Sequence, residues 1–216
     1  LAPVPEREFR SIAEMVRGET MQVDLIRVTD DDGTDRVAVN VVSAGFDAAV
    51  AKGMNKYRGK PLVSGGAAYK LSVLHCLATA LRHRFTLVVD GAVVGEERGD
   101  ALFVVCANGR YYGGGFLASP MSVLDDGLLD FLRIDSVSRS KLLRLAGVFR
   151  RGRHLETRPD LVQHARCKWM QICSTAAIDT NLDGELLALR NPRMEVLPAA
   201  LQTILPHAVR EPTAPA

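Results

Sequence analysis

The stretch Phe85–Ala107, FTLVVDGAVVGEERGDALFVVCA, decides the fold class. Two short apolar runs flank Asp90-Gly91, and a third, Leu102–Ala107, follows after a charged connection that contains two further glycines. An Asp-Gly pair between two apolar runs is a strong short-range signal for a β-hairpin. Because three strands are predicted in succession without an intervening helix, the stretch favours an antiparallel sheet.

Further strands are predicted on both sides of this stretch, and few helices separate them. The predicted strands are Val23–Val28, Val37–Val42, Leu128–Ile134, Cys167–Cys173, Ile178–Asn181 and Arg193–Leu197. Helices are predicted over Phe46–Tyr57, Ser64–Arg84 and Ser138–Arg151. Since the strands and helices do not alternate, a parallel doubly wound sheet is disfavoured.

We therefore predict a mainly β (α+β) fold, an antiparallel β-sandwich with a few packed helices. The sandwich is expected to span residues 21–197. Residues 1–20 are expected to form a short helix and interdomain linker. The proline-marked residues 198–216 are expected to form a tail that runs along the surface or returns to a neighbouring domain.

The composition indicates an ordinary globular protein and excludes several classes. The 216 residues are 47% hydrophobic and 24% charged, which allows one main domain with a sizeable core. The net charge of +2 is too small to indicate a nucleic-acid partner. Four cysteines without a C-x-x-C pair do not support a zinc cluster or a thioredoxin-type site. No apolar run is long enough to span a bilayer, so a soluble or peripheral protein is expected.

The segment Asn181-Leu182-Asp183-Gly184-Glu185 is the first candidate for chemistry. Asp-Gly between two strands is typical of a plain hairpin turn with exposed carboxylates. Alternatively, the sharp turn projects Asp183 and Glu185 rigidly into a cleft, where a carboxylate could accept a proton from a hydroxyl nucleophile. The residues alone leave both interpretations open.

Two other loops contain residues suited to ligand binding. Asn108–Phe116 contains Gly113, Gly114 and Gly115, which would expose backbone N–H groups to a ligand; a flexible hairpin end is the alternative. Leu124–Asp130 combines aspartates with Gly127, and carboxylate and carbonyl oxygens suit hard cations. An acidic turn that enters a strand explains the same residues.

The segment Ser136–Lys168 is strongly basic. It contains nine Lys and Arg residues against only Glu156 and Asp160. Such a segment is usually a solvated face, although it could also contact anionic lipid head groups.

Four segments together resemble one family, the diacylglycerol kinase catalytic-domain superfamily, which includes the sphingosine kinases and the bacterial YegS-like lipid kinases. They follow the order of the family's motifs along nearly the whole chain, whereas each motif alone is weak. The four segments are Asn40–Ala48, Asn108–Phe116, Ser119–Asp130, and Asn181–Glu185 followed by Glu195–Leu201.

The resemblance implies a reaction and a fold. Enzymes of this superfamily transfer the γ-phosphate of ATP to a lipid hydroxyl. They combine a nucleotide-binding domain, which carries a Gly-Gly-Asp-Gly-Thr loop, with a C-terminal β-sandwich like that of NAD kinases. Carried over to this chain, Glu185 is the general base and Asp183 supports the turn or the metal.

The resemblance also implies binding sites. Mg²⁺ is expected at the side chain of Asp126 and the backbone carbonyls of Val123 and Leu128. Asn108 and Gly113–Gly115 are expected to face ATP, and the acceptor is expected to be diacylglycerol or a related lipid.

One departure from the family is large, because no Gly-Gly-Asp-Gly-Thr loop occurs in this sequence. Leu1 falls about where the nucleotide-binding domain would end, so the chain is expected to be a C-terminal lobe that is inactive alone. A non-catalytic lipid-binding fragment and an NAD-kinase-like activity on a soluble substrate are the alternatives. A cytoplasmic, peripherally membrane-associated protein is expected, and a homodimer stays open.

Overall fold

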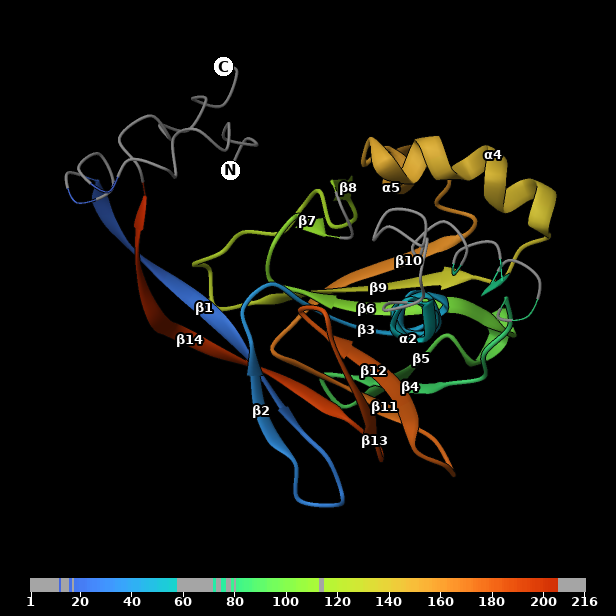
Figure 1. Cartoon of the computed structure of the whole chain (residues 1–216), viewed down its shortest axis with the longest axis horizontal. Helices are drawn as coiled ribbons and strands as arrows, with labels where there is room; N and C mark the ends of the chain where they lie inside the picture. Colours follow the sequence, from blue (N-terminus) through green and yellow to red (C-terminus); the bar gives the residue numbers. More distant parts are fainter. Residues whose placement is uncertain are drawn as a thin grey trace.

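A computed structural model describes residues 12, 16, 18–57, 72, 75, 76, 79, 81–112 and 115–205 (Figure 1). Two six-stranded antiparallel sheets form a sandwich, which confirms the predicted fold class. In order across sheet A the strands are β2 (Asp35–Ala38), β1 (Glu19–Thr29), β14 (Arg193–Leu205), β11 (Trp169–Cys173), β4 (Thr86–Val89) and β5 (Ala92–Val94). In order across sheet B they are β10 (Val162–Cys167), β9 (Leu129–Asp135), β6 (Ala101–Ala107), β3 (Val41–Gly45), β12 (Ile178–Leu182) and β13 (Glu185–Leu189).

The remaining elements are short and lie outside the two large sheets. They are α2 (Phe46–Tyr57), the 3₁₀ turn η2 (Glu96–Arg98), the small pair β7 (Tyr111–Tyr112) and β8 (Phe116–Leu117), α4 (Arg139–Arg150) and α5 (His154–Thr157). Helix α2 has the predicted bounds. Among the described residues, no helix is both long and apolar enough to cross a bilayer.

The Asp90-Gly91 turn forms as predicted. It joins β4 and β5, and Val89 pairs with Ala92 directly across it. Asp90 and Gly91 both have positive φ, 45° and 87°, which matches the twist of a two-residue hairpin.

The main core lies between the sheets and takes side chains from both. Sheet A contributes Ile26, Leu87 and Met170, and sheet B contributes Val104 and Phe131, each exposed by 1% or less. Burying such a side chain contributes roughly 1.5–3 kcal/mol. The two sheets therefore depend on each other for stability.

Sheet B is also covered on its outer face. Leu142 and Phe149 of α4 pack there on an apolar cluster that includes Leu102 and Leu132, and α4 and α5 lie above β9 and β10 in Figure 1. Because both faces of sheet B are covered, β6 and β9 are buried along nearly their whole length. This explains why Leu102–Ala107 is an apolar run without alternation.

The predicted strand Cys167–Cys173 is wrong as a single element. Cys167 ends β10 in sheet B, and Trp169 begins β11 in sheet A. The chain changes sheets at Lys168, where the Asp90 carboxylate accepts the backbone N–H groups of Lys168 (3.0 Å) and Trp169 (3.0 Å). A periodic apolar pattern cannot reveal such a corner, because both halves are strands.

The predicted strand Val37–Val42 is also wrong as a single element, because it is divided between β2 of sheet A and β3 of sheet B. Other predicted elements end at different residues. The last strand continues past Leu197 to Leu205, so residues 198–205 of the expected tail are part of β14, and residues 206–216 lie outside the described part. A register shift between Val23 and Leu25 accommodates Pro198 and Ala199, whose φ is 49°. Of the predicted helix 64–84, the described residues 72, 75, 76 and 79 are helical, whereas Leu81 is a bend and His83 bridges to Ala101.

His154 anchors the α4–α5 layer. It is fully buried, its Nε2–H donates to the Ala118 carbonyl at 3.0 Å, and its ring stacks on Phe149 with centroids 4.7 Å apart. Within the described residues Nδ1 has no hydrogen-bond partner. Burial lowers the pKa of His154 below 6.5.

This burial predicts a loss of stability in mild acid. Below pH 6.5 the unfolded chain protonates His154 and the folded chain does not, so the free energy of unfolding falls as pH falls from 6.5 towards the lowered pKa. The slope contributed is up to about 1.4 kcal/mol per pH unit. Denaturant titrations across this range should give a flatter profile for His154→Gln, which stays neutral and keeps a donor. The control is His75→Gln, at an exposed position; an unchanged slope in His154→Gln would contradict the prediction.

Candidate active site

Four loops meet at one edge of sheet B. They are residues 39–40 before β3, residues 108–110 after β6, residues 118–128 before β9, and the turn 183–184 between β12 and β13. Strands β9, β6, β3, β12 and β13 are neighbours in this order and antiparallel, so these particular strand ends share an edge. The edge brings together segments that are up to about 145 residues apart in sequence.

The Asp183 carboxylate fastens the entrance to β3. It accepts the backbone N–H groups of Val39 (2.5 Å), Asn40 (3.2 Å) and Val41 (2.8 Å), while Asp183 N–H donates to the Val41 carbonyl. Three donors on one carboxylate leave little freedom to this side chain. The support of the turn expected of Asp183 agrees with these bonds, and its direct part in chemistry stays a prediction.

A second set of hydrogen bonds, around Asn181 and Asp47, fixes the same turn. Asn181 is 8% exposed; its Oδ1 accepts Gly184 N–H at 2.9 Å, and its Nδ2 donates to Asp47 Oδ2 at 3.0 Å. Asp47 also accepts the hydroxyl of Ser43 at 2.5 Å. Asn40–Ala48 and Asn181–Glu185, which the sequence singled out separately, are thus one hydrogen-bonded unit.

Glu185 is the exposed carboxylate at this rigid turn. It is the first residue of β13 and pairs with Leu182 across the hairpin. Among the described residues no hydrogen bond or ion pair engages its side chain. A carboxylate held on a fixed backbone with its oxygens unengaged is suited to accept a proton from a bound hydroxyl.

Asn40 joins the loop after β6 to this unit. Its carbonyl accepts N–H groups from Asn108 (2.9 Å) and Gly109 (3.1 Å), and its Nδ2 donates to the Tyr111 carbonyl at 2.9 Å. A Cβ added to Gly109 would lie 2.1 Å from Asn40 Oδ1. Glycine is therefore required here by the close approach of the Asn40 side chain.

The residues expected to face ATP are only partly described. Asn108 is 1% exposed, and its Nδ2 donates to the carbonyls of Asp24 (2.6 Å) and Val39 (3.0 Å), which gives it a structural role. Gly115 has a φ of 97° and open space around it. Gly113 and Gly114 lie outside the described residues. Contact of these four residues with a nucleotide stays a prediction.

Asp24 is the residue that sequence reasoning missed. It is 1% exposed; Oδ1 accepts Ala199 N–H and Oδ2 accepts Gly127 N–H, both at 2.7 Å. Its own N–H donates to the Leu124 carbonyl, and its carbonyl accepts from Asn108. The available signal was the alternation within the predicted strand Val23–Val28, which places the Asp24 carboxylate on the same face as the apolar Ile26 and Val28.

Mg²⁺ is the ion expected at Asp126, Val123 and Leu128. Asp126 Oδ2 instead forms an ion pair with Arg166, and Oδ1 accepts Leu128 N–H at 3.1 Å. The guanidinium of Arg166 repels a divalent cation, and within the described residues no three His, Cys, Asp or Glu side chains cluster as metal ligands. A Mg²⁺ ion at Asp126 would have to displace the Arg166 guanidinium from Oδ2, so its binding by Asp126, Val123 and Leu128 stays a prediction.

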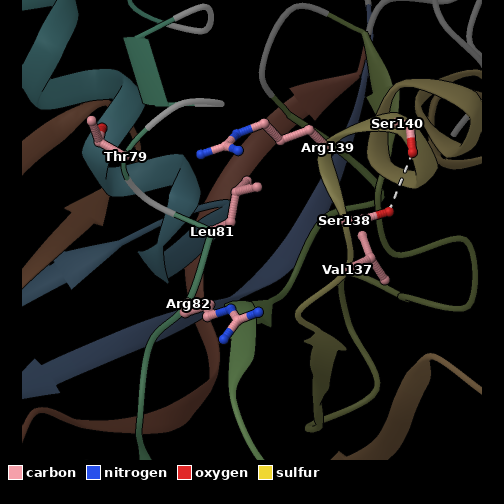
Figure 2. Close-up of a pocket in the computed structure, with 7 residues that line it drawn as sticks. All are labelled: Thr79, Leu81, Arg82, Val137, Ser138, Arg139 and Ser140. Atoms are coloured by element: carbon pink, nitrogen blue, oxygen red, sulfur yellow. Dashed lines mark hydrogen bonds between the residues drawn. The ribbon is translucent and has the colours of Figure 1, made fainter.

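A cavity of about 690 Å³ lies away from these loops, at the start of α4 (Figure 2). It is lined by Thr79, Leu81, Arg82, Val137, Ser138, Arg139 and Ser140. None of the sequence-predicted site residues lines it, so the converging loops stay the candidate site.

These loops lie within a region of the chain that matches a known protein family. The profile described as "YegS C-terminal NAD kinase beta sandwich-like domain" matches residues 40–205, which include all four motif segments. The chain belongs to this family. The match confirms the resemblance inferred from the motifs, and it places the family's sequence features on the sandwich itself.

Relatives of the chain in this family are longer proteins. The diacylglycerol kinase of Mycobacterium tuberculosis is 32% identical over 205 residues, which are 94% of this chain and 64% of that protein. The "probable lipid kinase YegS-like" of Stenotrophomonas maltophilia is 29% identical over 205 residues and is covered to the same 64%. A crystal structure of a diacylglycerol kinase from Bacillus anthracis shares the fold with a TM-score of 0.63, at 18% identity, over 96% of this chain and 62% of that one.

Removal of the Asp24 carboxylate is expected to destabilise the site edge. Asp24→Ala leaves the partly buried N–H groups of Gly127 and Ala199 without their carboxylate acceptor, at about 1–3 kcal/mol each. Denaturant unfolding should register a loss on the order of 2–5 kcal/mol. Asp32→Ala in the exposed β1–β2 turn is the matched control; equal losses in both variants would refute the role of Asp24.

Two glycines provide a second, paired prediction. Gly109→Ala must displace the Asn40 side chain and should lower the free energy of unfolding by about 1–3 kcal/mol. Gly147→Ala, in α4 with nothing within 4 Å of the added Cβ, should raise it by about 0.5–1 kcal/mol. Thermal or denaturant unfolding of both variants tests this prediction. If the two substitutions change the free energy of unfolding in the same direction, the requirement for glycine at position 109 is contradicted.

Proposed function

We propose that this chain is the C-terminal lobe of an ATP-dependent lipid kinase, which transfers the γ-phosphate of ATP to a hydroxyl group of diacylglycerol or a related lipid. The observation that carries the proposal is Glu185, whose side chain is exposed and unengaged among the described residues on a turn fixed by Asp183 and Asn181. Family membership and the names of the relatives supply the reaction class.

The proposed chemistry needs a base, because a lipid hydroxyl is a weak nucleophile at neutral pH. Glu185 accepts the hydroxyl proton as the hydroxyl oxygen bonds to the γ-phosphorus. The bond from that phosphorus to the bridging oxygen breaks, and ADP leaves. Asp183 and Asn181 act on the backbone of the turn, so their part is to position the Glu185 carboxylate.

The nucleotide is proposed to meet the lobe at the loop after β6. Gly115 has a positive φ and no neighbours around its α-carbon, so its backbone is open to a phosphate group. The chain spans about 64% of the length of its curated relatives. Most contacts with ATP are proposed to come from the part of such a protein that this chain does not include.

Substitution of the proposed base gives the decisive test. In a full-length protein that contains this chain, Glu185→Gln removes the proton acceptor, keeps the side-chain size, and should lower kcat by roughly 10²–10⁴-fold. The assay follows phosphatidic acid formed from diacylglycerol and ATP in detergent micelles. Glu97→Gln, an exposed glutamate in η2, is the control and should keep wild-type turnover.

Three outcomes would contradict parts of this proposal. Wild-type turnover in Glu185→Gln would show that Glu185 is not the general base. Phosphorylation of NAD instead of diacylglycerol by the full-length protein would replace the lipid acceptor with a soluble one. Binding of lipid without any transfer would favour a non-catalytic lobe.

A further inference from the structure

Helix α4 has one continuous outer face that is basic. The exposed residues Leu143, Arg144, Gly147, Arg150 and Arg151 follow each other at helical spacing, whereas Leu145 is buried. The opposite side of the helix packs on the outer face of sheet B. The exposed Arg144 and Arg150 are therefore on the side of α4 that faces away from sheet B. The helix lies at the edge of the molecule in Figure 1.

The positive charge of this face is not balanced within the layer. Helix α4 contains no acidic residue, although surface helices usually alternate the two signs. Arg144 donates to the backbone carbonyl of Ser140, and within the described part of the chain no acidic side chain pairs with Arg150, Arg151 or Arg153. Asp160, one of the two acids of the segment, is already paired with Arg158.

An apolar side chain lies among these charges. Leu143 is 63% exposed and lies on the same face of α4 as Arg144 and Arg150. Gly147, one turn further, leaves open space beside it. A basic face that also presents a leucine is typical of helices that lie in a membrane interface, where the charges meet phosphates and the leucine enters the acyl boundary.

Basic residues continue beyond the start of the helix. Figure 2 shows the side chains of Arg82 and Arg139 reaching toward the space between Thr79–Arg82 and Val137–Ser140. Arg82 is exposed and belongs to a different part of the chain from α4. Basic side chains are thus not confined to the outer face of α4.

We propose that the outer face of α4 and of its C-terminal cap, which presents Leu143, Arg144, Arg150 and Arg151, is a docking surface for an anionic lipid bilayer. Charge complementarity selects the partner, and Leu143 favours a bilayer over a nucleic acid, which would offer no apolar phase at this position. The proposal concerns binding only and goes beyond the proposed kinase reaction, since docking needs neither Glu185 nor a nucleotide.

Vesicle sedimentation of a full-length protein tests the surface. The vesicles contain phosphatidylcholine alone, or phosphatidylcholine and phosphatidylglycerol in roughly equal parts. Binding is expected only to the anionic vesicles and should weaken as salt is raised. The triple variant Arg144→Gln, Arg150→Gln, Arg151→Gln should lose on the order of a hundredfold in the partition coefficient, and Leu143→Ser about threefold to tenfold.

The control variant loses the same charge elsewhere. Arg36→Gln, Lys168→Gln, Arg190→Gln changes three exposed residues outside α4 and should bind like wild type. Circular dichroism and thermal melts verify that both triple variants are folded. Both should phosphorylate a short-chain diacylglycerol in micelles as wild type does, which keeps this result independent of the proposed reaction.

Three results would overturn the proposal. One is equal loss of vesicle binding in the control and α4 variants. Another is undiminished binding in the α4 variant. The third is binding of the wild-type protein to a short DNA duplex without binding to anionic vesicles, which would assign the face to nucleic acid.

Discussion

A buried carboxylate organises the edge of the sandwich where the candidate site lies. Asp24 is almost inaccessible to water, and within the described residues no cation pairs with it, so backbone N–H groups must satisfy its oxygens. Those donors come from the loop before β9 and from the bulge in β14, while its own carbonyl holds Asn108. The side chain and the backbone carbonyl of this one residue thus fix the positions of three segments that are distant in sequence.

The candidate site contains two kinds of residue. The side chains of one kind hold the backbone of the turn in place, and the side chain of Glu185 makes no hydrogen bond or ion pair among the described residues. Hydrogen bonds to the turn and to the start of β3 engage the side chains of Asp183, Asn181 and Asp47. Glu185 is exposed beside them. This division is what catalysis by a positioned group requires, because the bonds that fix the backbone are formed before any substrate arrives.

Patterns of neighbouring residues predicted many elements of the fold and of the candidate site. They failed where an element depends on residues that are distant in sequence. Asp90-Gly91, the bounds of α2, and the hairpin at Asp183-Gly184 follow from nearby residues, since turn chemistry and helical spacing act over a few positions. The corner at Lys168 depends on a carboxylate from β4's turn, and the extension of β14 depends on its pairing with β1. Asp24 was missed for the same reason, because its partners are far away in sequence. The ion pair of Asp126 with Arg166 likewise joins a loop to a strand that no spacing relates.

The long pair of strands β1 and β14 has a mechanical consequence. Between Glu19 and Val23 the two strands pair with each other beyond the reach of β2 and β11, and they project from the body of the sandwich in Figure 1. Asp24 and Ala199 are hydrogen-bonded to each other where this projection joins the body. A displacement at the far end of the projecting strands would pull on Gly127 through the Asp24 carboxylate and on Asn108 through the Asp24 carbonyl. A force on the projecting strands is therefore expected to act first on these two loops, which lie at the same edge of sheet B as Glu185.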